Sequence, residues 1–372
     1  RRDLLGRGIP ARRLVEALRA GRPGLETFQP GGLEFAIPRP DGGTDPCYVE
    51  IPEGYDPSKP APLLFWLHGI GGNGRDIRRA LQDVARRRGT IVACPFAGRW
   101  GKIPQTWEPG EDQVALRTLR ELHRRLAIDP DRVWLFGVSL GGFGAWEIGL
   151  VHPDRFAALV TVAGGLSFLE YTGLEDPIQR RRLANARNLP VYMAHGSDDA
   201  VVPVRFDRKT KADLEALGYA FDYREQDGRG HLPPPKEELD RLVEELLDWL
   251  ADRRRDPWPE EVVRVAFRSD VDVGCWVSID RADWRGGRVR ARRRPGNAFE
   301  VEASGATRIA LDLSSDVVDL SAPVRVECGG RVVFEGLVPS DPALVLDEAR
   351  RRGEGRRVAE ARLRIDLPES GR

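Results

Sequence analysis

A serine, a histidine and two neighbouring aspartates are the residues whose types and spacing in this sequence could do chemistry. Ser139 lies in the pentad G-V-S-L-G at 137–141, after an apolar run at 133–138 and before a helical pattern at 140–150. A chain that turns from strand to helix within one residue strains that residue and points its side chain away from the core. The flanking glycines leave room for this turn. The motif predicts that Ser139 is a nucleophile; the alternative is a glycine-rich turn with an idle serine.

A serine hydroxyl needs a base and a carboxylate to become a good nucleophile, and candidates for both follow it in the expected order. His231 lies in a glycine-bounded loop after the predicted strand at 220–226, and Asp198 and Asp199 follow the predicted strand at 190–196. The histidine would take the serine proton and return it to the leaving group, while the carboxylate would hold the imidazole in position. Their positions in the sequence alone do not decide whether Asp198 or Asp199 would be the carboxylate that contacts the histidine.

The elements that must position these side chains are strands alternating with helices between about residues 47 and 250. Helical patterns occur at 76–87, 112–126, 140–150 and 236–250, and strand patterns at 47–52, 63–67, 90–95, 133–138, 156–164, 190–196 and 220–226. This alternation predicts a mostly parallel sheet with helices on both faces, an α/β fold. The candidate residues all follow predicted strands, so we expect them at one edge of the sheet.

The pattern changes after a charged, proline-containing linker near residue 255. Short β-type runs fill residues 262–340, with another at 362–367, and predict a small β-sandwich. The expected organisation is an N-terminal arm with a short helix over residues 1–45, an α/β catalytic domain over 46–255, and a C-terminal β-rich accessory domain over 256–372.

Three stretches, "LLFWLHGIGGNG", "IDPDRVWLFGVSLGGFGAW" and "MAHGSDDAVVP", resemble the α/β-hydrolase superfamily. Within it, the sequence is most similar to carboxylesterases of the polyhydroxyalkanoate depolymerase and feruloyl-esterase-like group. The family pattern HGxxDxxVP implies that Asp199 is the triad acid, that Asp198 forms the turn, and that His195 is structural rather than a competing base.

The resemblance also implies an oxyanion hole made of two backbone N–H groups. One belongs to Leu140, directly after the nucleophile, and the other to Ile70 in the glycine-rich loop after the strand at 63–67. The alternative for this loop is a flexible connection without a catalytic role.

Composition excludes several other classes of function. Fifty-eight basic and 58 acidic residues give a formal net charge of zero, which argues against a nucleic acid or an anionic membrane as partner. The four cysteines are far apart, so neither a metal site nor a disulfide framework is expected. No apolar stretch has the length of a membrane span. The chain begins at Arg1 rather than Met, and removal of a leader is one explanation, so the sequence leaves the compartment open.

The candidate catalytic residues Ser139, Asp199 and His231 predict a serine hydrolase that cleaves carboxylic esters through an acyl-enzyme, without a metal or organic cofactor. A serine peptidase of the prolyl-oligopeptidase type and a non-catalytic binding protein on a hydrolase scaffold are the alternatives. The segment 166–188 is too short for a cap domain, so an open site suited to bulky, aryl or polymeric esters is expected.

Four tryptophans leave a choice between binding and packing. Trp100 and Trp107 either line the substrate pocket or pack their loop on the domain. In the accessory domain, Trp276 and Trp284 either bind a polymer at the surface or belong to the core, and the strand-like run around Trp276 favours the core for that residue.

Overall fold

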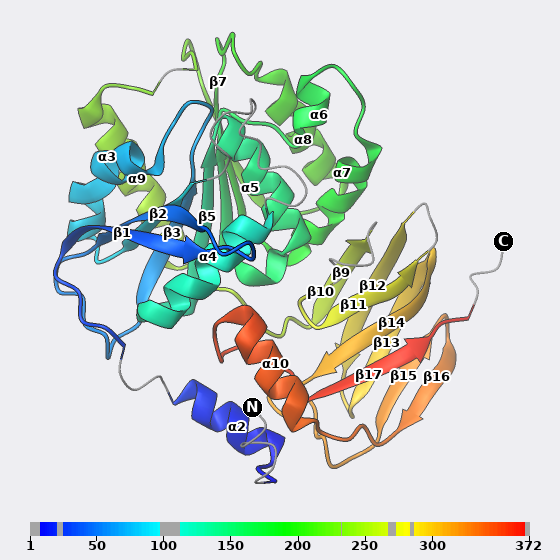
Figure 1. Ribbon diagram of the computed structural model, residues 1–372. Helices are drawn as coiled ribbons and strands as arrows, with labels where there is room; N and C mark the ends of the chain where they lie inside the picture. Colours follow the sequence, from blue (N-terminus) through cyan, green and yellow to red (C-terminus); the bar gives the residue numbers. More distant parts are fainter. Residues whose placement is uncertain are drawn as a thin grey trace. The chain divides into compact units, whose positions relative to one another are not determined.

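The computed structural model describes residues 8–20, 25–96, 112–231, 233–266, 273–282 and 286–368. The chain divides into two compact units. The large unit comprises residues 24–150 and 155–255, and the small unit comprises residues 1–23, 151–154 and 256–372. Each unit has its own sheets in Figure 1.

The large unit is built on one eight-stranded sheet with the order β1-β2-β4-β3-β5-β6-β7-β8. β1 pairs antiparallel with β2 and β2 with β4, whereas the neighbours from β4 to β8 all run parallel. The strands are β1 (Gly31–Pro38), β2 (Thr44–Ile51), β3 (Ala61–Leu67), β4 (Ile91–Pro95), β5 (Ile128–Val138), β6 (Ala158–Val162), β7 (Val191–Gly196) and β8 (Phe221–Gln226). The predicted α/β class and the mostly parallel sheet are confirmed.

Helices cover both faces of this sheet because the central strands are apolar on both faces. Along β3, Leu63 and Phe65 belong to one hydrophobic core, and Leu64 and Trp66 to another. The first core includes α4 (Asp112–Arg125) and α5 (Leu140–Val151), and the second includes α3 (Gly74–Arg87) and α9 (Lys236–Ala251). Between α5 and β8, the described residues also form η1 (Pro153–Arg155), α6 (Phe168–Tyr171), α7 (Pro177–Arg182), η2 (Leu183–Asn188) and α8 (Arg205–Ala216).

The structure divides the segment that the sequence analysis treats as one N-terminal arm. Helix α2 (Ala11–Arg19) belongs to the small unit, where its apolar side chains share a core with α10 (Pro342–Arg352). Residues 31–38 instead form the edge strand β1, paired with β2 along its whole length. The alternation of Leu33, Phe35 and Ile37 with exposed neighbours explains this strand, since those side chains pack on the large core.

The small unit contains two sheets with one hydrophobic core between them. One has the order β10-β11-β14-β17 and the other β16-β15-β13-β12-β9. Trp276 is buried in that core and its indole N–H donates to the Pro259 carbonyl over 2.7 Å, so this tryptophan is a packing residue. Trp284 lies outside the described residues. The strands are β9 (Glu261–Ala266), β10 (Val273–Gly274), β11 (Val277–Ala282), β12 (Gly287–Arg294), β13 (Ala298–Ser304), β14 (Ala306–Leu313), β15 (Val324–Cys328), β16 (Arg331–Gly336) and β17 (Ala361–Asp366).

Charged side chains are also buried in the small unit. The Arg357 side chain is fully buried and pairs with Glu348 at 3.0 Å and with Asp312 at 3.2 Å. Burial alone would raise the pKa of Glu348, but the charges of Arg357 and neighbouring arginines outweigh it and lower that pKa to about 2. Removing one member would leave an uncompensated buried charge, so the cluster acts as a unit.

The four cysteines are all buried and free. Over the described ranges, no helix has the length and apolar composition needed to cross a membrane. The same part of the chain holds no cluster of three or more His, Cys, Asp or Glu residues suited to a metal ion.

Candidate active site

Ser139 occupies the turn between β5 and α5 with a backbone φ of 55°, in the left-handed region that non-glycine residues rarely adopt. Its N–H donates to the Val162 carbonyl of the neighbouring strand over 2.8 Å, which fixes the turn to the sheet. The flanking glycines are required by space. A Cβ on Gly137 would lie 1.9 Å from the Gly141 carbonyl oxygen, and one on Gly141 would lie 2.1 Å from the Leu67 carbonyl oxygen. Ser139 therefore occupies the strained strand-to-helix turn that its motif predicts.

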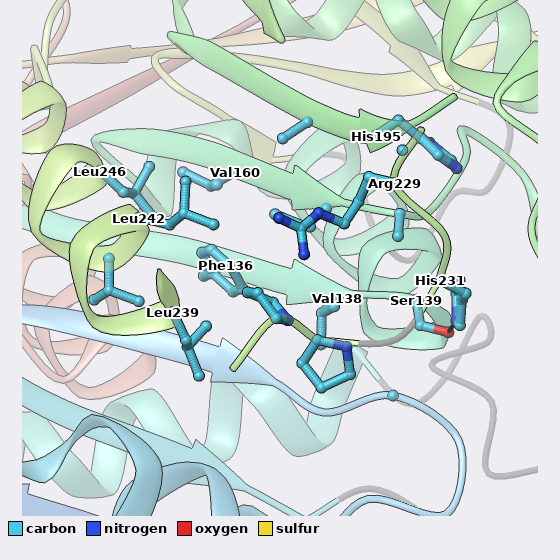
Figure 2. A pocket seen from close by; sticks show the side chains of 18 of the residues that line it. Phe136, Val138, Ser139, Val160, His195, Arg229, His231, Leu239, Leu242 and Leu246 are labelled. Carbon is cyan, nitrogen blue, oxygen red and sulfur yellow. Dashed lines mark hydrogen bonds between the residues drawn. The ribbon is translucent and has the colours of Figure 1, made fainter. Parts of the chain in front are cut away.

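Ser139, His231 and Asp199 form a continuous hydrogen-bonded chain. Ser139 Oγ lies 2.9 Å from His231 Nε2, and His231 Nδ1 lies 2.7 Å from Asp199 Oδ2. The three residues follow β5, β8 and β7, whose carboxyl ends share one edge of the sheet. Figure 2 shows Ser139 and His231 side by side. The arrangement suits proton transfer from the serine hydroxyl to the imidazole.

The structure distinguishes the two aspartates that position alone leaves open. The Asp199 side chain is fully buried, and its Oδ1 accepts the backbone N–H groups of Val201 and Val202 at 2.9 and 2.8 Å. Asp198 is exposed and accepts a hydrogen bond from Ser197 Oγ over 3.0 Å. Of the two carboxylates, it is Asp199 that contacts His231, through Oδ2, while its Oδ1 is held by the two backbone N–H groups.

A second buried histidine–aspartate pair lies behind Asp199, and the sequence analysis did not identify its acid. His195 Nδ1 lies 2.8 Å from Asp207 Oδ2, and Nε2 lies 2.7 Å from the Val202 carbonyl and 3.3 Å from Asp199 Oδ2. Burial lowers the pKa of His195, but the hydrogen bond and charge of Asp207 outweigh it and leave that pKa above its usual value. Both ring nitrogens of His195 therefore face acceptor oxygens. Asp207 lies in the first turn of α8, eight residues after Asp199, where the sequence carries no recognised motif.

The loop after β3 forms a tight turn against the nucleophile. The Gly72 N–H donates to the Gly69 carbonyl over 3.1 Å, and Gly71 has φ +67°, as the third position of a type II turn requires. A Cβ on Gly69 would lie 3.2 Å from Ser139 Cβ, so the two segments are in close contact. Among the described residues, no acceptor is found for the N–H of Ile70 or for that of Leu140. Both predicted oxyanion donors are thus available near the nucleophile.

No protein-family model matches the chain. Among curated proteins, the chain is similar to feruloyl esterase C of Emericella nidulans, with 29% identity over 164 residues, which are 42% of this chain and 55% of that protein. It is 23% identical over 217 residues to acyl-protein thioesterase 1 of Neurospora crassa, with 50% and 86% covered. A rice protein named "Probable inactive carboxylesterase" is 24% identical over 195 residues, with 45% and 77% covered. The match spans about half the length of feruloyl esterase C and of a protein named "Putative esterase NocK" from Nocardia uniformis subsp. tsuyamanensis, which is 29% identical over 177 residues.

The fold is shared with solved hydrolase structures. S-formylglutathione hydrolase from Agrobacterium tumefaciens superposes with a TM-score of 0.51 at 18% identity, covering 63% of this chain and 99% of that one. The chain has the α/β-hydrolase fold. Fluorophosphonate-binding serine hydrolase F of Staphylococcus aureus has a TM-score of 0.50 at 14% identity, covering 60% of this chain and 100% of that one.

A cavity of about 560 Å³ opens beside Ser139. Ser139, His231 and Ile70 line one part of it, and leucines of α9 line another. Figure 2 shows Ser139 and His231 at one end of the view, Leu246 at the other, and Arg229 between them. The sequence analysis did not predict this cavity. Trp100 and Trp107, the aromatic residues predicted for the pocket, lie outside the described residues.

Proposed function

We propose that this α/β-hydrolase is a serine esterase that cleaves carboxylic esters through an acyl-enzyme. The observation that carries the proposal is the hydrogen-bonded chain from Ser139 Oγ through His231 to Asp199, with distances of 2.9 and 2.7 Å. Its nucleophile stands on a strained turn with φ 55° at the mouth of a cavity. The names of the curated relatives, among them a feruloyl esterase and an acyl-protein thioesterase, support ester hydrolysis.

In this mechanism, Ser139 Oγ attacks the ester carbonyl carbon while His231 Nε2 takes the hydroxyl proton. Asp199 keeps the proton of the neutral ring on Nδ1 and stabilises the imidazolium that forms. The N–H groups of Ile70 and Leu140 donate to the oxyanion of the tetrahedral intermediate. His231 then gives its proton to the departing alcohol, which leaves an acyl group on Ser139. Water, activated by the same histidine, attacks the acyl-enzyme, releases the acid and returns the proton to Ser139.

We propose that the site is open on its outer side and accepts esters with a bulky or aryl alcohol group. The segment after β6 carries only the short helices α6 and α7 and the turn η2 among the described residues, and no inserted cap domain. The alternatives are a serine peptidase and a non-catalytic scaffold. A solved structure described as a "putative dipeptidyl aminopeptidase IV" from Bacteroides ovatus shares the fold, with a TM-score of 0.52 at 15% identity, covering 60% of this chain and 36% of that one. Complete geometry of all three catalytic groups favours an enzyme over the scaffold.

The test is hydrolysis of a panel of p-nitrophenyl acyl esters and feruloyl esters by the wild type and by Ser139→Ala. We expect the variant to lose about 10⁶-fold in kcat, while Ser58→Ala, which changes a serine in an exposed turn, keeps wild-type activity. A fluorophosphonate probe should label the wild type and Ser58→Ala but not Ser139→Ala. A folded wild type that hydrolyses no ester and resists the probe would refute the proposal, and cleavage of peptide anilides alone would favour the peptidase.

A further inference from the structure

We propose that the cavity beside Ser139 binds an unbranched, uncharged acyl chain of the ester, and that it selects medium-length chains. This inference rests on the proposed esterase function. It adds the substrate class, an aliphatic acyl group that lies inside the large unit rather than across its surface.

The cavity leads from the nucleophile into the protein along two neighbouring strands. Val138 directly precedes Ser139, and both line the cavity together with Phe136, two residues back on β5. Val162 and Val160 repeat this spacing on β6, which pairs with β5. Two residues of a strand span about 6.6 Å, so the cavity recedes from the strand ends toward the middle of the sheet. An acyl group on Ser139 can extend along this path.

The opposite wall is apolar as well and sets the length of the path. Leu239, Leu242 and Leu246 project from successive turns of α9 into the cavity, as Figure 2 shows. Their seven-residue span corresponds to about 10 Å of helix. A zigzag carbon chain advances about 1.25 Å per bond, given a single-bond length near 1.5 Å, so the path accommodates about eight carbons. The volume of about 560 Å³ falls in the range of ligand pockets, about 300–1,000 Å³.

The charges in the wall favour an uncharged chain over a dicarboxylate. Arg229 and Arg224 line the cavity, but both are paired with glutamates of α9. Arg229 pairs with Glu238, and Arg224 Nη1 lies 2.7 Å from Glu245 Oε2. A ligand carboxylate would have to displace one of these carboxylates. An aliphatic chain leaves both ion pairs in place and covers the apolar strand and helix side chains. Water is a poor occupant of the leucine-lined end, because it needs two to four polar partners there.

The first experiment is the chain-length profile of the wild type with straight-chain p-nitrophenyl esters and with straight-chain alkyl fluorophosphonates. We expect kcat/KM and the inactivation rate to rise about fourfold per CH₂ up to about the octanoyl length, then to fall, because longer chains no longer fit the cavity. A profile that is flat or falls from acetyl onward, in a protein whose Ser139 still reacts, would overturn the inference while the esterase function stands.

The second experiment fills the leucine-lined end with Leu242→Trp. We expect the octanoyl ester to lose at least ten times more kcat/KM than the acetyl ester. The matched control is Leu217→Trp, at the end of α8 and outside the cavity lining, which should keep the wild-type profile. Leu239→Phe makes the same test if circular dichroism shows that Leu242→Trp is unfolded. An unchanged profile in a folded cavity variant would refute the assignment.

A binding measurement separates this inference from the esterase proposal. Saturation-transfer NMR on the Ser139→Ala protein should detect methyl octanoate, and adding Leu242→Trp should abolish the signal. Binding without turnover in the wild type would leave the cavity assignment intact and refute the esterase function. Absence of binding together with normal ester hydrolysis would refute the cavity assignment alone.

Discussion

Replacing Asp199 by Asn tests whether its carboxylate sets the tautomer of His231. Asp199 Oδ1 accepts the backbone N–H groups of Val201 and Val202, and Oδ2 faces His231 Nδ1 at 2.7 Å. The two backbone donors keep the amide oxygen of Asn on their side, so the amide NH₂ replaces Oδ2 and can only donate. Nδ1 must then accept, and the ring proton moves to Nε2. His231 can no longer take the proton of Ser139.

The size of the effect follows from this tautomer change. The same exchange in a Ser-His-Asp protease lowers kcat about 10⁴-fold, which equals about 5 kcal/mol of transition-state stabilisation at 1.36 kcal/mol per tenfold change. We expect kcat for a p-nitrophenyl ester to fall about 10⁴-fold in Asp199→Asn, with little change in KM. Stopped assays with a coloured product measure this range when enough enzyme is used.

The matched control is Asp198→Asn, one residue away. Its exposed carboxylate accepts only from Ser197 Oγ among the hydrogen bonds of the described residues. Losing it should change kcat less than about threefold, within the range of surface substitutions. Equal losses in both variants, or an Asp199→Asn enzyme within tenfold of the wild type, would refute the tautomer argument.

Three further predictions concern stability. Gly137→Ala would place a Cβ 1.9 Å from a carbonyl oxygen of α5, so it should lower the free energy of unfolding in urea by about 3 kcal/mol or more. The control is Gly149→Ala on α5, whose Cβ would make ordinary contacts and which should be neutral or stabilise by up to about 1 kcal/mol. Equal effects of the two substitutions would contradict the steric explanation. The pKa of His195 is raised by Asp207, so the stabilising contribution of the protonated ring is complete below about pH 6.5 and is lost as the pH rises through the raised pKa. The difference in unfolding free energy between the wild type and His195→Gln should therefore shrink as the pH rises above about 6.5. A difference that stays constant with pH would contradict this prediction. Arg357→Met should lower the free energy of unfolding by about 3–5 kcal/mol and shift acid unfolding to higher pH. The reason is that Glu348, whose pKa is about 2, contributes stability above its usual pKa, and this stability is lost as the pH falls toward 2. Calorimetry at several pH values measures the shift, and an unchanged midpoint of acid unfolding would contradict the prediction.

Much of the fold could be predicted because its signals are local. The apolar run at 63–67 becomes β3, and the leucine-rich pattern at 236–250 becomes α9. β1 was not predicted, because glycine and proline around residues 31–38 obscure the alternation of apolar and polar side chains. The strand is stable only when it pairs with β2. The helix at 342–352 was also not predicted, since its buried face includes charged residues that only the ion pairs of the small unit make stable.

The sequence by itself determined which residues are candidates for the nucleophile and the base, and their order along the chain. A glycine-flanked serine between a strand and a helix is a local geometric requirement, so Ser139 could be predicted from its neighbours. The tertiary structure decided which residues meet across the sheet. The contact of Asp199 with His231, the pairing of Asp207 with His195, and the cavity between strands and α9 join segments far apart in the chain. Distances between such segments depend on how helices pack on the sheet, and no local pattern of residues encodes that packing.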